Sequence, residues 1–205
     1  MFTGITRGTF PVTRLERAPG RLSYVVALPA QLTAGLEIGA SVSIDGVCQT
    51  VVAHNDGEVE FDAIDETLRV TTLDALYVGA LVAVERSFRV GDEIGGHEVS
   101  GHIIGTGTIM EVRKDGGAHD MLIQVPVAWM KYILPKGFIA VDGSSLTVGA
   151  VDDSGWFEVH LIPETLRLTN LGHKVAGSRV NIELDARTVA IVTTVERVLA
   201  QRGYK

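Results

Sequence analysis

The side chains of this sequence that could do chemistry are a lone cysteine, a serine and two neighbouring histidines. Cys48 offers a thiol nucleophile and Ser41 a hydroxyl, while His102 has an ordinary pKa near neutrality that suits proton transfer. His97 lies five positions before His102, and no further cysteine or histidine extends this pair into a zinc-type ligand set. We therefore expect nucleophilic or acid-base chemistry without a metal, although a lone buried cysteine is more often a small apolar residue.

The elements that must position these residues come from an internal duplication. The segment 66–73 recurs as 164–171, 98 positions later, with six of eight residues identical. The segment 45–51 likewise matches 142–148 at an offset of 97. This repeat predicts two homologous domains of about 100 residues each, and a domain of that size can bury its own core.

Within each copy, short apolar runs alternate with turn residues, as is typical of all-β barrels or sandwiches. In the first copy the runs cover 24–28, 41–45, 59–63 and 81–85. Short helices are expected to start at Pro29 and Pro126, where proline suits the first helical position, and at Glu66 and Glu164. We place the first barrel at residues 1–95 and the second at 96–185, because the glycine pair 95–96 marks a turn between them.

The last twenty residues lie outside the repeat and predict one amphipathic helix over 186–205. Val189, Val192, Val195 and Leu199 recur at three- and four-residue spacing, and Asp185 is placed to cap the helix. Such a helix most often packs against its own domain, but its terminal position favours a role in oligomerisation.

Composition excludes several classes of function. The net charge of −7 and the absence of a basic cluster disfavour nucleic acid and anionic membranes as partners. No apolar run approaches the roughly 20 residues of a membrane span, and the N-terminus lacks the pattern of a secretory signal. A single cysteine allows no intrachain disulfide, which suits a reducing compartment, so we expect a cytoplasmic protein.

Several ordered motifs resemble the riboflavin synthase family over essentially the whole chain. They are MFTGI at 1–5, IGGHEVSGH at 94–102, LIPETL at 161–166 and the two DGxxxTV segments. The resemblance implies two six-stranded antiparallel Greek-key barrels, a C-terminal helix that holds a homotrimer, no cofactor and an association with lumazine synthase. It also implies the dismutation of two molecules of 6,7-dimethyl-8-ribityllumazine, in which one gives a four-carbon unit to the other. The products are riboflavin and 5-amino-6-(ribitylamino)uracil.

Two identical substrates with different roles suggest how to sort the residues. Positions alike in both copies are expected to bind the rings, and positions that differ are candidates for chemistry. Substrate binding is predicted for Gly4, Ile5, Thr6, Cys48, Gln49, Thr50, Asp62, Ala63, Ile64, Asp65, Glu66, Thr67, Gly101, His102, Ile103, Lys136, Ser145, Leu146, Thr147, Leu161, Ile162, Pro163, Glu164 and Thr165. The resemblance assigns catalysis to Ser41, Cys48, His102 and Asp185. It also implies that a neighbouring chain contributes Lys136 to the site.

Several alternatives remain at this point. Asp185 equally suits a helix cap, and the repeated Glu-Thr-Leu-Arg equally suits the start of a short helix. Gln49 and Ser144 depart from the family pattern, which has leucine and an aliphatic residue at these places, so affinity or packing could differ. The alternative functions are a non-catalytic lumazine- or flavin-binding protein and a purely structural barrel module. The presence of Ser41 and Cys48 together with His102 favours the enzyme.

Overall fold

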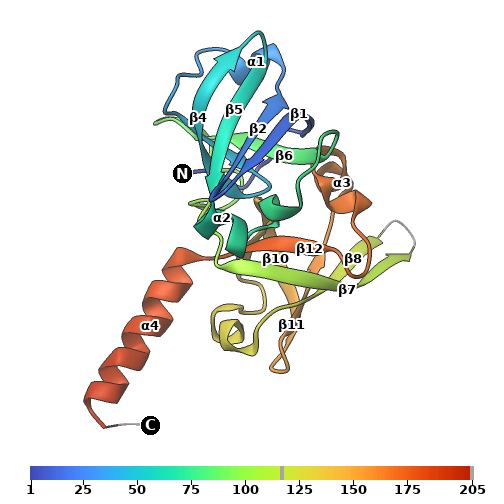
Figure 1. Cartoon of the computed structure of the whole chain (residues 1–205). Coiled ribbons are helices and arrows are strands. Elements are labelled where there is room, and N and C mark those ends of the chain that lie inside the picture. Colours follow the sequence, from blue (N-terminus) through green and yellow to red (C-terminus); the bar gives the residue numbers. More distant parts are fainter. Residues whose placement is uncertain (116–117, 204–205) are drawn as a thin grey trace.

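The computed structural model describes residues 1–115 and 118–203 and contains two closed barrels and a C-terminal helix (Figure 1). The first barrel comprises β1 (Thr9–Ala18), β2 (Arg21–Ala27), β3 (Ser41–Ile44), β4 (Val47–Asn55), β5 (Glu58–Ile64) and β6 (Leu81–Arg86). The second comprises β7 (Gly105–Asp115), β8 (Ala118–Gln124), β9 (Phe138–Val141), β10 (Ser144–Asp152), β11 (Trp156–His160) and β12 (Arg179–Leu184). Both have the same antiparallel order, β1-β2-β5-β4-β3-β6 and its counterpart, so the predicted duplicated barrels are confirmed.

Helical turns form at all four predicted places, within one residue of the expected start. The helices and 3₁₀ turns between strands are α1 (Ala30–Thr33), α2 (Asp65–Val70), η1 (Thr72–Ala75), η2 (Val127–Tyr132), α3 (Pro163–Leu168) and η3 (Asn170–His173). Pro163 occupies the first turn of α3, where its missing N–H costs nothing. The turn after Pro126 is a 3₁₀ helix, η2.

Each barrel has its own apolar core, built by alternation along the strands. In β5 the side chains of Val59, Phe61 and Ala63 are buried, and in β11 those of Phe157 and Val159 are buried. Fully burying a side chain such as valine or phenylalanine contributes about 1.5–3 kcal/mol. The two cores form separate clusters, so each barrel is a frame that can hold its own set of loops.

The barrels meet through two equivalent hairpin turns. Asp45-Gly46 joins β3 to β4 and Asp142-Gly143 joins β9 to β10, with φ of 46° and 84° in the first turn and 44° and 79° in the second. Two consecutive positive φ angles define the hairpin turn for which Asp-Gly is favoured. A Cβ on Gly46 would lie 2.5 Å from the Gly143 nitrogen, so only glycine allows the turns to touch.

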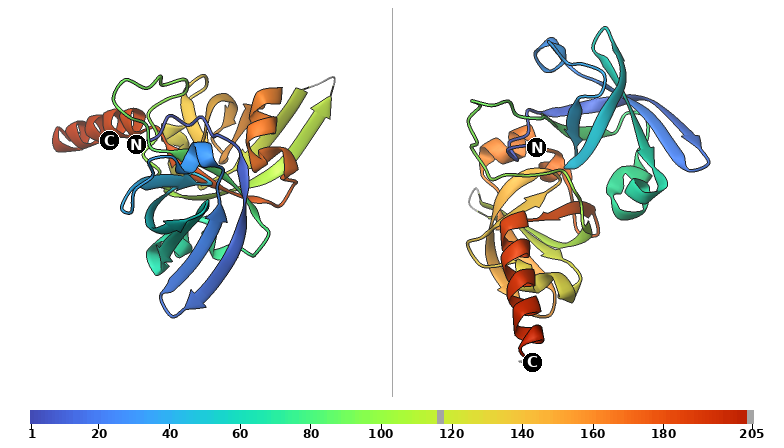
Figure 2. Two further views of the ribbon diagram at one scale, coloured as in Figure 1. Left: turned by 90° about the horizontal axis from the view of Figure 1, so that it is seen from above. Right: turned by 90° about the vertical axis from the view of Figure 1, so that its left-hand side faces the viewer.

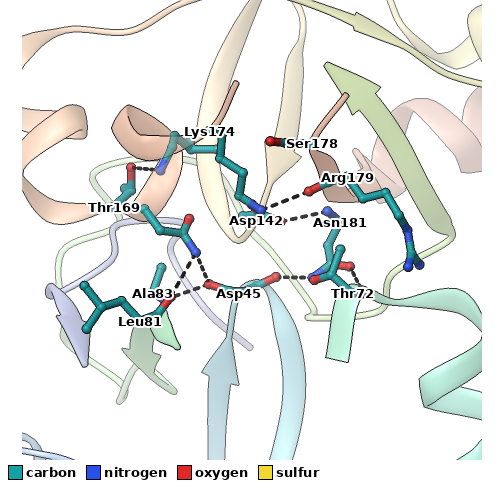
Figure 3. Close-up of polar contacts among 12 residues, drawn as sticks. Asp45, Thr72, Leu81, Ala83, Asp142, Thr169, Lys174, Ser178, Arg179 and Asn181 are labelled. Carbon is teal, nitrogen blue, oxygen red and sulfur yellow. Dashed lines mark hydrogen bonds and ion pairs between the residues drawn. The ribbon is translucent and has the colours of Figure 1, made fainter. Parts of the chain in front are cut away.

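Polar side chains that contact the residues of these turns join the two barrels (Figure 3). Asn170 Nδ2 of the second barrel donates to Asp45 Oδ1 of the first at 2.8 Å, and Asn181 Nδ2 donates to the Asp45 carbonyl at 2.8 Å. Lys174 Nζ lies 2.8 Å from Asp142 Oδ2. Burial, with the charge of Asp142 as the next cause, raises the pKa of Asp45 from about 3.8 to about 7.

This shift predicts a pH-dependent stability. Between pH 4 and 7 the unfolded chain ionises Asp45 while the folded protein keeps it protonated, so its contribution to the unfolding free energy falls as pH rises. Below and above this window the contribution is constant. Asp45→Asn should remove a slope that approaches about 1.4 kcal/mol per pH unit, measured as the difference between wild-type and variant denaturant curves. Parallel pH dependences would contradict the assignment.

The C-terminal helix α4 (Ala186–Gln201) confirms the predicted amphipathic helix; it extends away from the first barrel and contacts the second (Figures 1 and 2). Lys131 Nζ of η2 lies 2.6 Å from Glu196 Oε2 of the helix. Ile191 is 65% exposed and Val195 50% exposed, so part of the apolar stripe is uncovered within one chain. None of the helices in the described part of the chain has the length and apolar character needed to cross a membrane.

Candidate functional site

The segments that precede the two barrels are exchanged between them. Gly4 precedes the first barrel, yet its carbonyl accepts a hydrogen bond from Ser145 N of the second barrel at 2.8 Å. Gly101 precedes the second barrel, and its carbonyl accepts from Cys48 N of the first at 2.9 Å. Accordingly, Phe2 near the N-terminus packs against Ala140 of β9 in the second barrel. Each barrel therefore completes a site with backbone that belongs, by sequence, to the other.

Glycine is required at both crossing points. Gly4 has φ of +73° and Gly101 of +80°, a region that residues with a Cβ rarely adopt. A Cβ on Gly4 would lie 2.6 Å from Ser145 Cβ, and a Cβ on Gly101 would lie 2.6 Å from Cys48 Cβ. The backbone of the two glycines thus contacts one pair of equivalent positions, which is cysteine in the first copy and serine in the second.

A buried carboxylate anchors each exchanged segment. Glu183 of β12 accepts hydrogen bonds from Ser100 N and Oγ, both at 2.7 Å, and from Gly101 N at 2.8 Å. Glu85 of β6 does the same for residues 3–4, with distances of 2.7, 2.7 and 3.0 Å. Burial raises the pKa of Glu85, although these hydrogen bonds oppose the shift. The crossings are held by equivalent contacts in both copies.

Beside the Gly4 crossing lies a hollow of about 130 Å³, which we call the second-copy hollow. It is lined by Gly4, Ile5, Thr6, Ser144, Ser145, Ile162, Glu164, Thr165, Leu168 and Thr169. Seven of these residues are predicted from the sequence to bind substrate, namely Gly4, Ile5, Thr6, Ser145, Ile162, Glu164 and Thr165. The structure therefore brings together residues from the chain's start, β10 and α3.

The equivalent first-copy site is centred on the contact between Cys48 and Gly101. The Cys48 side chain is half-buried. His102, the residue after Gly101, is exposed, and its backbone N–H donates to Ser100 Oγ at 3.3 Å. Ser41 lies at the start of β3, opposite Thr50 in the ladder that also pairs residue 43 with Cys48. Three of the four predicted catalytic residues thus come from adjoining parts of one barrel end.

Asp185 and Lys136 lie elsewhere. Asp185 caps α4, because its Oδ2 accepts from Thr188 N at 2.9 Å, so the helix-cap interpretation is confirmed. Its side chain shares a hollow of about 320 Å³ with His97 and Phe138, and Phe138 is the counterpart of Ser41 in the second copy. Lys136 is exposed with φ of +65°. Among the described residues, no hydrogen bond joins Asp185 to Ser41, Cys48 or His102.

Some predicted binding residues have side chains in the barrel cores, namely Gln49, Ala63, Leu146 and Leu161. Gln49, one of the two family departures, accepts a hydrogen bond from Tyr24 OH at 3.2 Å and donates to the Cys48 carbonyl at 3.0 Å. The other departure, Ser144, has a buried hydroxyl without a hydrogen-bond partner in the described structure. The Gln49 substitution is thus compensated inside the barrel, and the Ser144 hydroxyl is left at the wall of the second-copy hollow.

The remaining predicted binding residues lie in β5, α2, β10 and α3, or in the segment just before β7. Asp62 accepts from Ser23 Oγ at 2.5 Å, and Asp65 and Glu66 lie in the first turn of α2. Glu164 pairs with Arg167 at 2.6 Å in α3, which is the helix-start geometry that the repeated motif also suggested. For these residues, and for Ile64, Thr67, Ile103, Thr147 and Pro163, binding roles remain predictions.

Three functional candidates become visible only in the folded structure. Glu85 and Glu183 occupy equivalent repeat positions, which was the available signal for their shared role. In the sequence His97 suggests only half of a weak metal pair, whereas in the structure its Nδ1 lies 2.6 Å from Ser145 Oγ. His97 therefore belongs to the second copy, whereas His102 adjoins Gly101 in the first.

Comparison with known proteins gives a consistent result. The lumazine binding domain family matches the chain twice, at residues 3–87 and 100–185. Riboflavin synthase of Escherichia coli (strain K12) is 49% identical over 98% of this chain and 95% of its own length, and that of Chlamydia pneumoniae is 40% identical over 99% of each chain. The crystal structure of LumP complexed with riboflavin is 25% identical, with a TM-score of 0.83 over 90% of this chain and 100% of that one.

Proposed function

Because the chain belongs to the riboflavin synthase family and has that enzyme's activity, we propose that each barrel binds one 6,7-dimethyl-8-ribityllumazine at its glycine crossing. The observation that supports this proposal is the reciprocal exchange of Gly4 and Gly101, which gives both copies the same backbone frame. The residues placed on that frame differ, with Cys48 in one copy and Ser145 in the other. Similar recognition with different reactive groups suits a reaction between two identical molecules.

The proposed reaction begins with loss of a proton from the 7-methyl group of one lumazine, whose ring system stabilises the resulting anion. His102 receives or relays this proton, with Ser41 in its hydrogen-bond chain, and Cys48 or a water adds to the ring of the acceptor. The two rings join, and the adduct fragments with release of the added thiolate or water and return of the proton, so that a four-carbon unit passes from donor to acceptor. Holding the two rings face to face supplies most of the acceleration, since effective molarities of roughly 10⁵ M or more are available from orientation.

Replacing His102 by glutamine should slow riboflavin formation by about 10²-fold without abolishing it. The variant loses a proton-transfer group but keeps the backbone that holds the rings, and a single acid-base group contributes about 10² to 10⁴ in rate. The side chain is exposed, so the melting temperature should stay unchanged. The measurement is steady-state turnover by absorbance, and a wild-type rate would exclude His102 from the proton relay.

We further propose that α4 assembles the chain into a homotrimer in which the site lies between the first barrel of one chain and the second barrel of the next. The exposed Ile191 and Val195 support a helix contact between chains. In that arrangement Lys136 of a neighbouring chain reaches the site. We also propose that this enzyme is cytoplasmic and that it associates with lumazine synthase.

Deleting residues 186–205 should dissociate the assembly and reduce activity by more than about tenfold. The deletion removes the helix, including the contact of Val189 with the second core, but keeps all the strands that close the two barrels, so the sedimentation velocity should report a folded monomer. Substitution of the exposed Ile191 by aspartate is a milder variant that should have the same direction of effect. A fully active monomer would refute the interchain site.

The same barrels could instead hold a ligand without converting it, because the LumP complex with riboflavin shares this fold. Mixing the purified protein with dimethylribityllumazine distinguishes the two functions. An enzyme forms riboflavin, seen as a red-shifted absorbance, together with an equal amount of the pyrimidinedione. A binding protein gives a bound lumazine with no second product.

A further inference from the structure

A histidine that the proposed mechanism does not use lies directly behind the second-copy hollow. His97 is only 8% exposed, and its Nδ1 is 2.6 Å from Ser145 Oγ. Its ring stacks on Phe138, with ring centroids 5.1 Å apart and an interplanar angle of 15°. The imidazole is thus fixed by a hydrogen bond along one edge and by an aromatic ring against its face.

The chain before His97 is shaped to allow this contact. A Cβ on Gly96 would lie 2.4 Å from the Thr3 carbonyl oxygen and 2.6 Å from Ser145 Cβ, so no larger residue fits there. Ser145 is held from the other side as well, because its N–H donates to the Gly4 carbonyl at 2.8 Å. Both the backbone and the hydroxyl of Ser145 are therefore constrained.

The arrangement distinguishes the second copy from the first. Ser145 is the counterpart of Cys48, and Phe138 is the counterpart of Ser41. Within the described residues the Cys48 thiol makes no hydrogen bond, whereas Ser145 Oγ has the imidazole as a partner. The copies therefore differ in the side-chain atom, sulfur in Cys48 and oxygen in Ser145, and in whether that atom has a hydrogen-bond partner.

The chemistry of the pair favours an oriented hydroxyl. Burial lowers the pKa of His97, although the charge of Asp185 opposes this, so the ring is neutral at neutral pH. A neutral imidazole either accepts the serine hydrogen or donates to the serine oxygen. In both cases His97 occupies one of the three hydrogen-bonding directions of the hydroxyl and restricts its rotation, which leaves the other directions for a ligand in the hollow that Ser145 lines.

We propose that His97 is a positioning residue of the second-copy hollow, which orients the Ser145 hydroxyl as a hydrogen-bond partner for the lumazine bound there. The inference rests on the proposed binding of one lumazine at each glycine crossing. Ser145 touches the ligand, and His97 acts only through Ser145. The pair gives the second copy a fixed polar contact that Cys48 does not provide in the first.

The test is a double-mutant cycle on the full-length protein, measured as kcat/KM for riboflavin formation. His97→Phe keeps an aromatic ring against Phe138 but removes the hydrogen bond, and Ser145→Ala removes the partner. Each should lower kcat/KM by about tenfold, and the double variant should lose no more than either single variant. His97→Asn places an amide atom near the position of Nδ1 and should restore most of the rate, which a purely structural role of the ring would not explain.

Thr165→Val is the matched control, since Thr165 lines the same hollow and, in the described part of the chain, makes no hydrogen bond to His97. It should lower kcat/KM by itself, and its effect should multiply with that of His97→Phe. The inference would be overturned if the double variant lost kcat/KM by the product of the two single losses of His97→Phe and Ser145→Ala. A wild-type kcat/KM for His97→Phe, or a failure of His97→Asn to restore the rate, would also overturn it. If Thr165→Val and Ser145→Ala both left the kinetics unchanged, the proposed binding at this crossing would fail as well.

Discussion

Replacing Gly101 by alanine is expected to reduce riboflavin formation by more than about 100-fold and to lower the free energy of unfolding by more than about 2 kcal/mol. Alanine must adopt φ of +80°, and its Cβ would lie 2.6 Å from Cys48 Cβ and 2.8 Å from Cys48 N. The crossing segment would have to move away from the first barrel. A displacement of about 1 Å at a reacting group can by itself cost about 10² in rate.

The control for this variant is Gly79→Ala. Gly79 also has a positive φ, +95°, but a Cβ there would meet nothing within 4 Å. Gly79→Ala should therefore show only the backbone strain, about 1–2 kcal/mol, with activity close to wild type. Circular dichroism melts and turnover measured on both variants distinguish the steric clash with Cys48 from the strain of a positive φ angle. Equal effects of the two substitutions would mean that the contact with Cys48 does not matter.

Replacing Glu183 by glutamine is expected to cost about 2–3 kcal/mol of stability and most of the activity. The carboxylate accepts three hydrogen bonds, from Ser100 N, Ser100 Oγ and Gly101 N. Glutamine turns one of its two acceptor oxygens into an NH₂ donor, so a buried donor faces another donor and the remaining bonds lose their charge. The segment that carries Gly101 and His102 would then be poorly held.

The equivalent variant Glu85→Gln should have a similar effect on the Gly4 segment, because its contacts are the same. Glu111→Gln, at an exposed residue paired with Arg113 at 3.7 Å, should change stability by less than about 0.5 kcal/mol. Denaturant unfolding and turnover are the measurements. Glu183→Gln behaving like Glu111→Gln would show that the carboxylate does not anchor the crossing.

Much of the fold could be predicted because its signals are local or repeated. The duplication at 66–73 and 164–171 indicated two equivalent domains, and alternation of buried residues such as Phe61 with polar neighbours indicated strands. Asp185 before an amphipathic stretch located a helix start. Each of these features depends on residues close together in the chain, so a sequence shows it directly.

The exchange of segments between barrels could not be predicted in this way. Gly4 and Ser145 are 141 positions apart, and neither residue type indicates that the start of the chain lies on the second barrel. The same reasoning applies to His97, whose partner Ser145 is 48 positions away, and to the contacts of Asp45 with Asn170 at the junction. Comparing the copies located the differing residues, but only the folded chain shows which crossing segment each of them meets.

The structure of the assembled protein with riboflavin bound tests the central claim most directly. We predict ligand at both crossings, with one ring against Gly4 and Ser145 and another against Gly101 and Cys48. Ligand at only one crossing, or only in the hollow of about 660 Å³ between the barrels that Tyr77 and Lys174 line, would contradict the account.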